Sequence, residues 1–227
     1  MPDARRAGLA TRALVLAALV LGTAACSRVP GVYVVVHPSG SGGAAAYVDG
    51  GSFDAQQYVD GIWSSQVLPA FRARALTAQA LISALTADPA KACTRYGNVP
   101  AQDSACAFMV KGTGRITGVA SSLSGTTLTV ELPPYNGSDV VSVDVGPAFT
   151  GTAVRDALPF IKFAQYTNQV DYAEVGIELN AMVRERVIGS DSFAGARGHA
   201  VTFVGATEGS DPQGIDVIPV ILTVGAS

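Results

Sequence analysis

Histidine is the scarcest of the chemically useful residues in this chain: among 227 residues there are two, His37 and His199. His37 lies in a stretch rich in Gly and Ser, and His199 precedes an apolar run, so neither is placed to be the base of a Ser/His/Asp triad. No metalloprotease, EF-hand or dinucleotide-binding pattern occurs. The sequence therefore predicts no catalytic residue, no bound metal and no cofactor.

Charge is also sparse, at 15% of residues with a formal net charge of -3. A chain without a basic patch or a run of one sign lacks the electrostatic attraction that nucleic acid requires, so we expect no nucleic-acid partner. The hydrophobic content of 48% over 227 residues is sufficient for the core of one domain or two small ones.

The first residues have the order of an export signal. Arg5, Arg6 and Arg12 precede an apolar run from Ala13 to Leu21, which leads into small residues. That run is shorter than the roughly 20 residues that a membrane-spanning helix needs. We predict a signal peptide over residues 1–25. An uncleaved anchor helix or a buried N-terminal helix is the alternative.

Cys26 follows directly and resembles the acylated cysteine of a bacterial lipoprotein, although Thr23 stands where Leu is usual. We predict lipidation at Cys26, which places the protein in the cell envelope, on the outer side of the cytoplasmic membrane or in the periplasm. Simple cleavage after Ala24 or Ala25 is the alternative. Residues 26–52 would then be the lipidated N-terminus and a flexible Gly/Ser/Ala-rich tether.

The other two cysteines, Cys93 and Cys106, flank a polar loop that contains Gly and Pro. In an oxidising compartment such a pair predicts a disulfide. A metal-binding pair and two free thiols are the alternatives, and no histidine lies near to complete a zinc site.

Residues 53–227 are expected to form a single folded domain that begins with a helical pair over 53–90. Apolar residues recur at helical spacing in two segments, 54–66 and 69–87, which Pro69 should separate. A further helix is expected over 168–188. Trp63 fits either packing on the apolar face or stacking on a ligand, and packing is commoner.

From residue 106 the apolar period changes to two, as in strands. Three strands ("FMVKGTGRITGV", "TTLTVEL" and "DVVSVDV") precede the helix at 168–188, and two follow it, over 200–205 and 215–224. This order predicts a mainly β fold with helices, a five-stranded OB-like Greek-key barrel over 106–227. A split α+β sheet is the rival architecture.

One segment combines adjacent opposite charges, prolines and several aromatic residues: "GPAFTGTAVRDALPFIKFAQYTNQVDYA", residues 146–173. We expect a helical turn stopped by Pro159, with Phe160 and Phe163 in the core. One interpretation is a structural plug in which Arg155 pairs with Asp156 or Glu174. The other is a polar ligand-binding pocket at the barrel mouth, formed by Thr152, Arg155, Asp156, Asn168 and Asn180.

The stretches "FDAQQYVDGIWSSQVLP", "VKGTGRITGV", "GPAFTGTAVRDALPFIKF", "NQVDYAEVGIELN" and "VIPVIL" resemble the bacterial family of predicted periplasmic lipoproteins of unknown function, domain of unknown function 2291. The resemblance runs from Phe53 to the C-terminus and implies an envelope lipoprotein with an OB-like barrel. It also implies an accessory role beside sugar ABC transporters, whose genes commonly neighbour those of the family.

These observations lead to three hypotheses about function. The first is a non-enzymatic, membrane-anchored accessory lipoprotein that binds an ABC-transporter component or a small, sugar-like ligand. The second is a structural or protein-interaction module with a plugged barrel. The third is an envelope hydrolase, for which the sequence offers no nucleophile–base pair.

Overall fold

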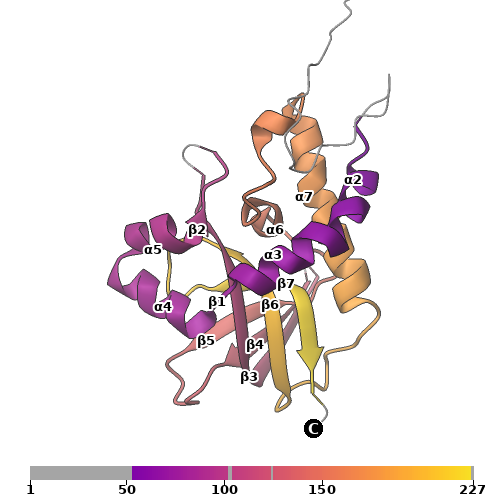
Figure 1. The fold of residues 1–227 in the computed structure, drawn as a ribbon. Coiled ribbons are helices and arrows are strands. Elements are labelled where there is room, and N and C mark those ends of the chain that lie inside the picture. The colour runs from indigo at the N-terminus through magenta and orange to yellow at the C-terminus, as the bar shows by residue number, and fades with distance from the viewer. Residues whose placement is uncertain (1–52, 102–103, 124, 226–227) are drawn as a thin grey trace, which may run out of the picture. The chain divides into compact units, whose positions relative to one another are not determined.

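The computed structural model describes residues 53–101, 104–123 and 125–225. The predicted signal peptide, Cys26 and the predicted tether lie outside these residues. Within them, a barrel of strands is covered by helices that precede it in the sequence and by helices inserted between its third and fourth strands (Figure 1). No helix in this described part is long and apolar enough to cross a bilayer.

Five strands close the barrel: β3 (Ala107–Ser122), β4 (Gly125–Glu131), β5 (Val140–Asp144), β6 (Ala200–Glu208) and β7 (Asp216–Val224). Their order is β3-β4-β5-β7-β6, and β6 pairs again with β3. The β5–β7 pairing is parallel, and the other pairings of the ring are antiparallel. The predicted five-stranded OB-like barrel is confirmed, and two short strands, β1 (Leu76–Thr77) and β2 (Gly97–Asn98), add to β3.

The barrel interior follows the alternation of the sequence. The inward-facing side chains are less than 4% exposed and comprise Phe108, Val110, Ile116, Leu128, Val130, Leu132, Val141, Val143 and Val145. Gly112 also faces inward, where a Cβ atom would lie 2.6 Å from Cζ of Phe203. Pro219 lies at a bulge of β7, since Gly205 pairs with it while Val204 pairs with Ile221.

The predicted interruption at Pro69 is wrong. Helix α2 (Ala55–Ile62) continues through a π-helical turn, η1 (Trp63–Val67), into α3 (Leu68–Arg74). In the π turn the N–H of Leu68 bonds to the carbonyl of Trp63. This shift in the bonding pattern lies directly before Pro69, which has no N–H of its own, and the helix continues past it.

The helix expected over 69–87 is instead broken at Ala75, whose backbone is extended. Leu76 and Thr77 pair with β3 in parallel, and the Thr77 side chain caps α4 (Ala78–Ala87). After Asp88 the chain forms a helix that was not predicted, α5 (Pro89–Tyr96). The N-terminal helical region thus extends beyond residue 90.

Cys93 of α5 and Cys106, next to β3, form a disulfide with their sulfur atoms 2.07 Å apart. Gly97 lies against it, and a Cβ atom there would collide with Sγ of Cys106. The bond links the helical region to the first strand of the barrel.

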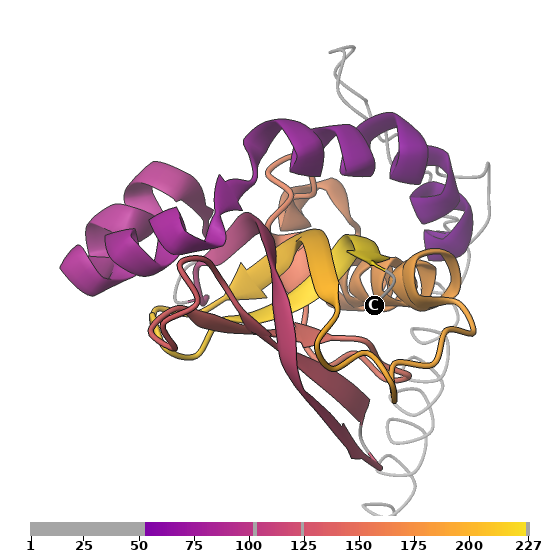
Figure 2. The same cartoon turned by 90° about the horizontal axis from the view of Figure 1, so that it is seen from below.

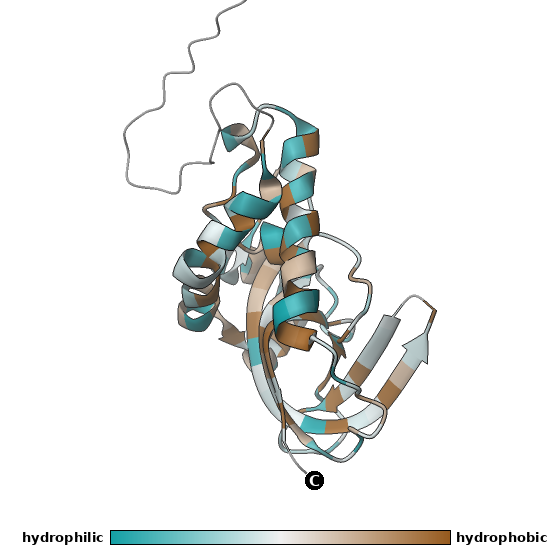
Figure 3. Ribbon diagram, turned by 90° about the vertical axis from the view of Figure 1, so that its right-hand side faces the viewer, coloured by the Kyte–Doolittle hydropathy of each residue, from teal (hydrophilic) through white to brown (hydrophobic). Residues whose placement is uncertain are grey.

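The segment between β5 and β6 contains α6 (Ala153–Asp156), α7 (Gln169–Val183) and a second π turn, η3 (Arg184–Ile188). Helix α6 contacts β3, β6, β7 and α7, and α2 packs beside α7. Figure 2 shows α2 and α3 arching over the barrel. The helices facing the viewer in Figure 3 are banded teal and brown, as expected of amphipathic helices that cover a core.

Phe163 was expected in the core and is 41% exposed, while Phe160 is half-buried. Leu158 and Ile161 are buried in their place. A tight turn, in which the N–H of Ile161 bonds to the carbonyl of Leu158, directs these two side chains inward.

Candidate functional site

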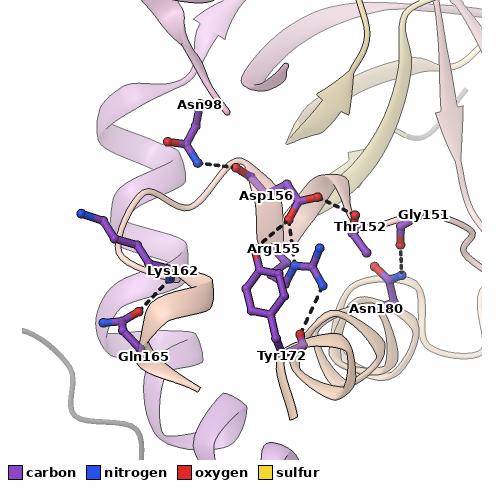
Figure 4. A network of polar contacts seen from close by, with 9 residues as sticks. All are labelled: Asn98, Gly151, Thr152, Arg155, Asp156, Lys162, Gln165, Tyr172 and Asn180. Carbon is purple, nitrogen blue, oxygen red and sulfur yellow. Dashed lines mark hydrogen bonds and ion pairs between the residues drawn. The ribbon is translucent and has the colours of Figure 1, made fainter. Parts of the chain in front are cut away.

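A polar cluster occupies the segment that the sequence singled out, on α6. Arg155 and Asp156 are 8% and 6% exposed. Arg155 Nε donates to Asp156 Oδ1 at 2.8 Å, and Thr152 Oγ1 donates to Asp156 Oδ2 at 2.5 Å (Figure 4). A buried carboxylate is stable only when its oxygens are bonded, and here both are.

Tyr172 on α7 forms the second wall of the cluster. The guanidinium carbon of Arg155 lies 3.8 Å from the centre of the Tyr172 ring, and Arg155 Nη1 donates to the Tyr172 carbonyl at 3.2 Å. The Tyr172 hydroxyl donates to Asp156 Oδ1 at 3.4 Å. Burial raises the pKa of this hydroxyl, although the nearby Arg155 opposes the shift. The phenol is therefore a protonated donor to the carboxylate.

Gly176 of α7 lets this helix lie close to α6. A Cβ atom at this position would lie 3.4 Å from Arg155 Nη1 and 3.4 Å from Thr152 Cγ2. A larger side chain would displace the guanidinium from the Tyr172 ring. The glycine thus has a packing function in the middle of a helix, where it is otherwise unfavourable.

At the edge of the cluster, Asn180 Nδ2 donates to the Gly151 carbonyl at 3.1 Å, while Asn180 Oδ1 is buried without a partner among the described residues. Glu208 at the end of β6 lies near, and a Cβ atom on Gly151 would be 3.0 Å from its Oε1. Partial burial raises the pKa of Glu208, Asp156 raises it further, and Arg155 lowers it.

Of the five predicted ligand-binding residues, Thr152, Arg155 and Asp156 meet in one hydrogen-bonded group, and Asn180 lies at its edge. Asn168 does not join them, because it caps α7 by accepting bonds from the N–H groups of Val170 and Asp171. The partner found by Arg155 is Asp156 rather than Glu174. These contacts have the form expected of the plug.

Three participants were missed by the sequence analysis: Tyr172, Gly176 and Asn98. Asn98 Nδ2 donates to the backbone carbonyl of Asp156 at 2.6 Å across 58 positions of the chain. A single Asn carries no sequence signal for such a contact. Gly176 did carry a sequence signal, since a glycine within a strongly helical pattern commonly has a packing reason.

Aromatic rings continue from the cluster towards the start of α2. The ring of Tyr166 lies 5.4 Å from those of Tyr172 and Phe53, and Tyr58 lies beside it. Burial raises the pKa of both Tyr58 and Tyr166. Trp63 is 3% exposed and packs in the core.

Beside the cluster is an open cleft of about 370 Å³. One wall is the segment 98–101, which begins at the last residue of β2, and the other consists of residues from 159 to 164, between α6 and α7. Val99 and Phe163 in these walls are 49% and 41% exposed, so both present apolar surface to solvent. Among the described residues, no group of three His, Cys, Asp or Glu side chains is placed to hold a metal ion.

A crystal structure of an OB-fold protein from Thermotoga maritima MSB8 superimposes on this chain with a TM-score of 0.63. The two sequences are 19% identical, and the match covers 77% of this chain and 100% of that one. At this identity the likeness concerns the fold alone. No curated protein matches the sequence.

The sequence also matches a family model over residues 16–223, described as a predicted periplasmic lipoprotein of unknown function, DUF2291. The match spans most of the chain, from within the predicted signal peptide to the last strand of the barrel, and includes the polar cluster. The chain therefore belongs to the DUF2291 family of predicted periplasmic lipoproteins, and its place is the cell envelope, anchored to a membrane by lipid.

Proposed function

We propose that the protein is a non-enzymatic accessory lipoprotein of an ABC-type sugar uptake system, and that it docks a transporter component at the cleft between residues 98–101 and 159–164. The observation that supports this most is that the buried Arg155–Asp156 pair of the polar cluster is already bonded within the protein. Both carboxylate oxygens of Asp156 and the Nε and Nη1 atoms of Arg155 are bonded within the protein. A polar ligand at this place would have to break existing bonds.

The cleft differs from the cluster because its apolar groups face solvent. Val99, Pro100, Pro159 and Phe163 line it, and Lys162 adds one positive charge. Covering exposed apolar surface yields about 25 cal/mol per Å², whereas covering a satisfied polar group yields little. An apolar segment of a partner protein, with an acidic residue to meet Lys162, is the occupant that fits this chemistry.

Site-specific photo-crosslinking in intact cells tests the proposal. A crosslinker placed at Phe163 is expected to capture a permease or substrate-binding component of a sugar ABC transporter, identified by mass spectrometry. Leu123, which is fully exposed next to the described end of β3, is the matched apolar control. Equal capture at both positions, or capture of unrelated proteins only, would contradict docking at the cleft.

A second candidate is favoured by the size of the cleft. Its volume of about 370 Å³ lies within the range of ~300–1,000 Å³ typical of small-molecule sites. A sugar-like ligand at a hundred times its dissociation constant would stabilise the protein by about 2.7 kcal/mol. Thermal-shift screening against sugars and nucleosides, repeated with Phe163→Ala, separates this candidate from docking of a protein.

A further inference from the structure

We propose that the outer face of the barrel, where β3 meets the loop after β4, binds a pyranose ring of a glycan, with Tyr135 as the stacking surface and Arg115 as the hydrogen-bond donor. This inference goes beyond the proposed function. It uses neither the cleft nor the polar cluster.

Tyr135 has an unusual backbone conformation. Among the described residues it alone, apart from glycines, has a positive φ, of 62°. A bulky side chain adopts this conformation only at a cost, whereas Gly or Asn adopts it readily. The Tyr135 side chain is 43% exposed, so burial in the core does not explain an aromatic residue at this position. Strain that is retained at a residue outside the core is a common mark of a functional position.

The loop holds Tyr135 in a defined position. The N–H of Tyr135 bonds to the Leu132 carbonyl at 3.0 Å, and the N–H of Gly137 bonds to Glu131 Oε1 at 2.7 Å. The amide and hydroxyl groups of Ser138 both donate to Asn136 Oδ1. These bonds order the loop backbone at Tyr135, so less conformational freedom is lost when a ligand stacks on its ring.

Arg115 provides a polar group beside the ring. It lies on β3 opposite Glu131 of β4, and its guanidinium carbon is 5.1 Å from the centre of the Tyr135 ring. The guanidinium forms no hydrogen bond or ion pair with any other described residue. Its N–H groups are therefore available to acceptors on a ligand.

A pyranose ring combines the two properties that this pair can recognise. Its C–H face stacks on an aromatic ring, and its hydroxyl or carboxylate oxygens accept bonds from a guanidinium. OB barrels commonly bind oligosaccharides or oligonucleotides on the face formed by their second and third strands, and Tyr135 lies in the loop that joins these strands here, β4 and β5. The net charge of -3 disfavours a polyanionic nucleic acid, which leaves the glycan.

The experiment uses the full mature chain with its disulfide intact, in a detergent without a sugar headgroup. The probes are a β-1,4-linked N-acetylglucosamine tetramer and maltotetraose, titrated by NMR. Tyr135→Asn is expected to weaken binding at least tenfold while the melting temperature stays the same or rises, because Asn relieves the strain. Arg115→Gln is expected to weaken binding with little change in the melting temperature.

Tyr96 provides a matched control. It is 41% exposed, and the guanidinium carbon of Arg95 lies 5.1 Å from its ring centre, but it ends α5 without a positive φ. Tyr96→Asn is expected to leave the affinity within twofold of the wild type.

Three results would overturn the proposal: no saturable binding of either tetramer, wild-type affinity in Tyr135→Asn, or tighter binding of a thymidine tetranucleotide than of both sugars. Phe163→Ala serves to separate the two proposals, because the glycan site predicts that this change in the cleft leaves tetramer binding intact. A tetramer that responds to Phe163 and not to Tyr135 would assign sugar binding to the cleft and refute the site at Tyr135.

Discussion

Arg155 and Asp156 are neighbours in the chain and pair with each other inside the domain, with Nε and Oδ1 2.8 Å apart and each side chain less than 10% exposed. The other ion pairs of the described residues, Lys91–Asp88 and Arg186–Asp60, lie at the surface. If one partner of the Arg155–Asp156 pair is removed, the remaining charge is therefore buried away from water, which is not the case for the two surface pairs.

Arg155→Ala is expected to lower the free energy of unfolding by about 3–5 kcal/mol, because it leaves the Asp156 carboxylate buried and unpaired. Arg186→Ala removes an exposed partner of Asp60 and is expected to cost no more than about 1 kcal/mol. Urea denaturation of both variants measures the difference. A loss for Arg155→Ala as small as that for Arg186→Ala would contradict the plug.

Gly112→Ala is expected to destabilise the protein by about 1–3 kcal/mol, because the added methyl group meets the Phe203 ring inside the barrel. Gly61→Ala is the control: it lies in α2 with open space around it and should stabilise the protein by about 0.5–1 kcal/mol. Thermal melts of the two variants should shift in opposite directions. A melting temperature of Gly112→Ala at or above that of the wild type would show that the barrel tolerates the methyl group.

Replacing Cys93 and Cys106 by Ser is expected to cost about 3 kcal/mol, since the disulfide closes a short loop and restricts the unfolded chain. Equilibrium unfolding with and without reductant gives the value for the wild type. The double variant should be insensitive to reductant. Peptide mapping that finds both thiols free would remove the basis of this prediction.

Stability should fall as the pH rises through the folded-state pKa of Asp144. Burial raises this pKa, nearby Asp216 adds to the shift, and a hydrogen bond from Thr127 opposes it. The folded state thus binds the proton more tightly than the unfolded state, so stability is greatest below the unfolded pKa. Asp144→Asn should stabilise the protein at neutral pH, by no more than about 1 kcal/mol for this half-exposed group, and give no gain in acid.

Cys26→Ser should release the protein from membranes, because it removes the predicted site of lipid attachment. Detergent phase partitioning of the two proteins tests this: the wild type should enter the detergent phase and the variant the aqueous phase. A wild type that stays aqueous would favour simple cleavage after Ala24 or Ala25.

The barrel could be predicted because the alternation of apolar and polar residues within each strand shows which side chains face the core. Val141 and Val143 are buried while Ser142 between them is half-buried, which is the period-two pattern of the sequence. The helix breaks were harder because they depend on partners far along the chain. Ala75 leaves the helix so that Leu76 and Thr77 can pair with β3, and this pairing outweighs the local helical preference.

The part of the polar cluster that depends on local sequence spacing could also be predicted. Thr152 and Asp156 are four residues apart, so one helical turn brings them together. Tyr172 and Asn98 reach Asp156 from other elements, through the packing of α7 and the position of β2. Helical spacing contains no information about such contacts.

The position of β6 in the sequence has a consequence for how the protein is made. β3 pairs with β6 along its first half, from Ala107 opposite Glu208 to Arg115 opposite Ala200, and α6 and α7 lie between them in the chain. During synthesis from the N-terminus, β3, β4 and β5 emerge as an open sheet with unpaired backbone groups on both edges. Such edges invite pairing with other chains. Closure must wait for β6 and β7, so the risk of aggregation is greatest before these two strands have emerged.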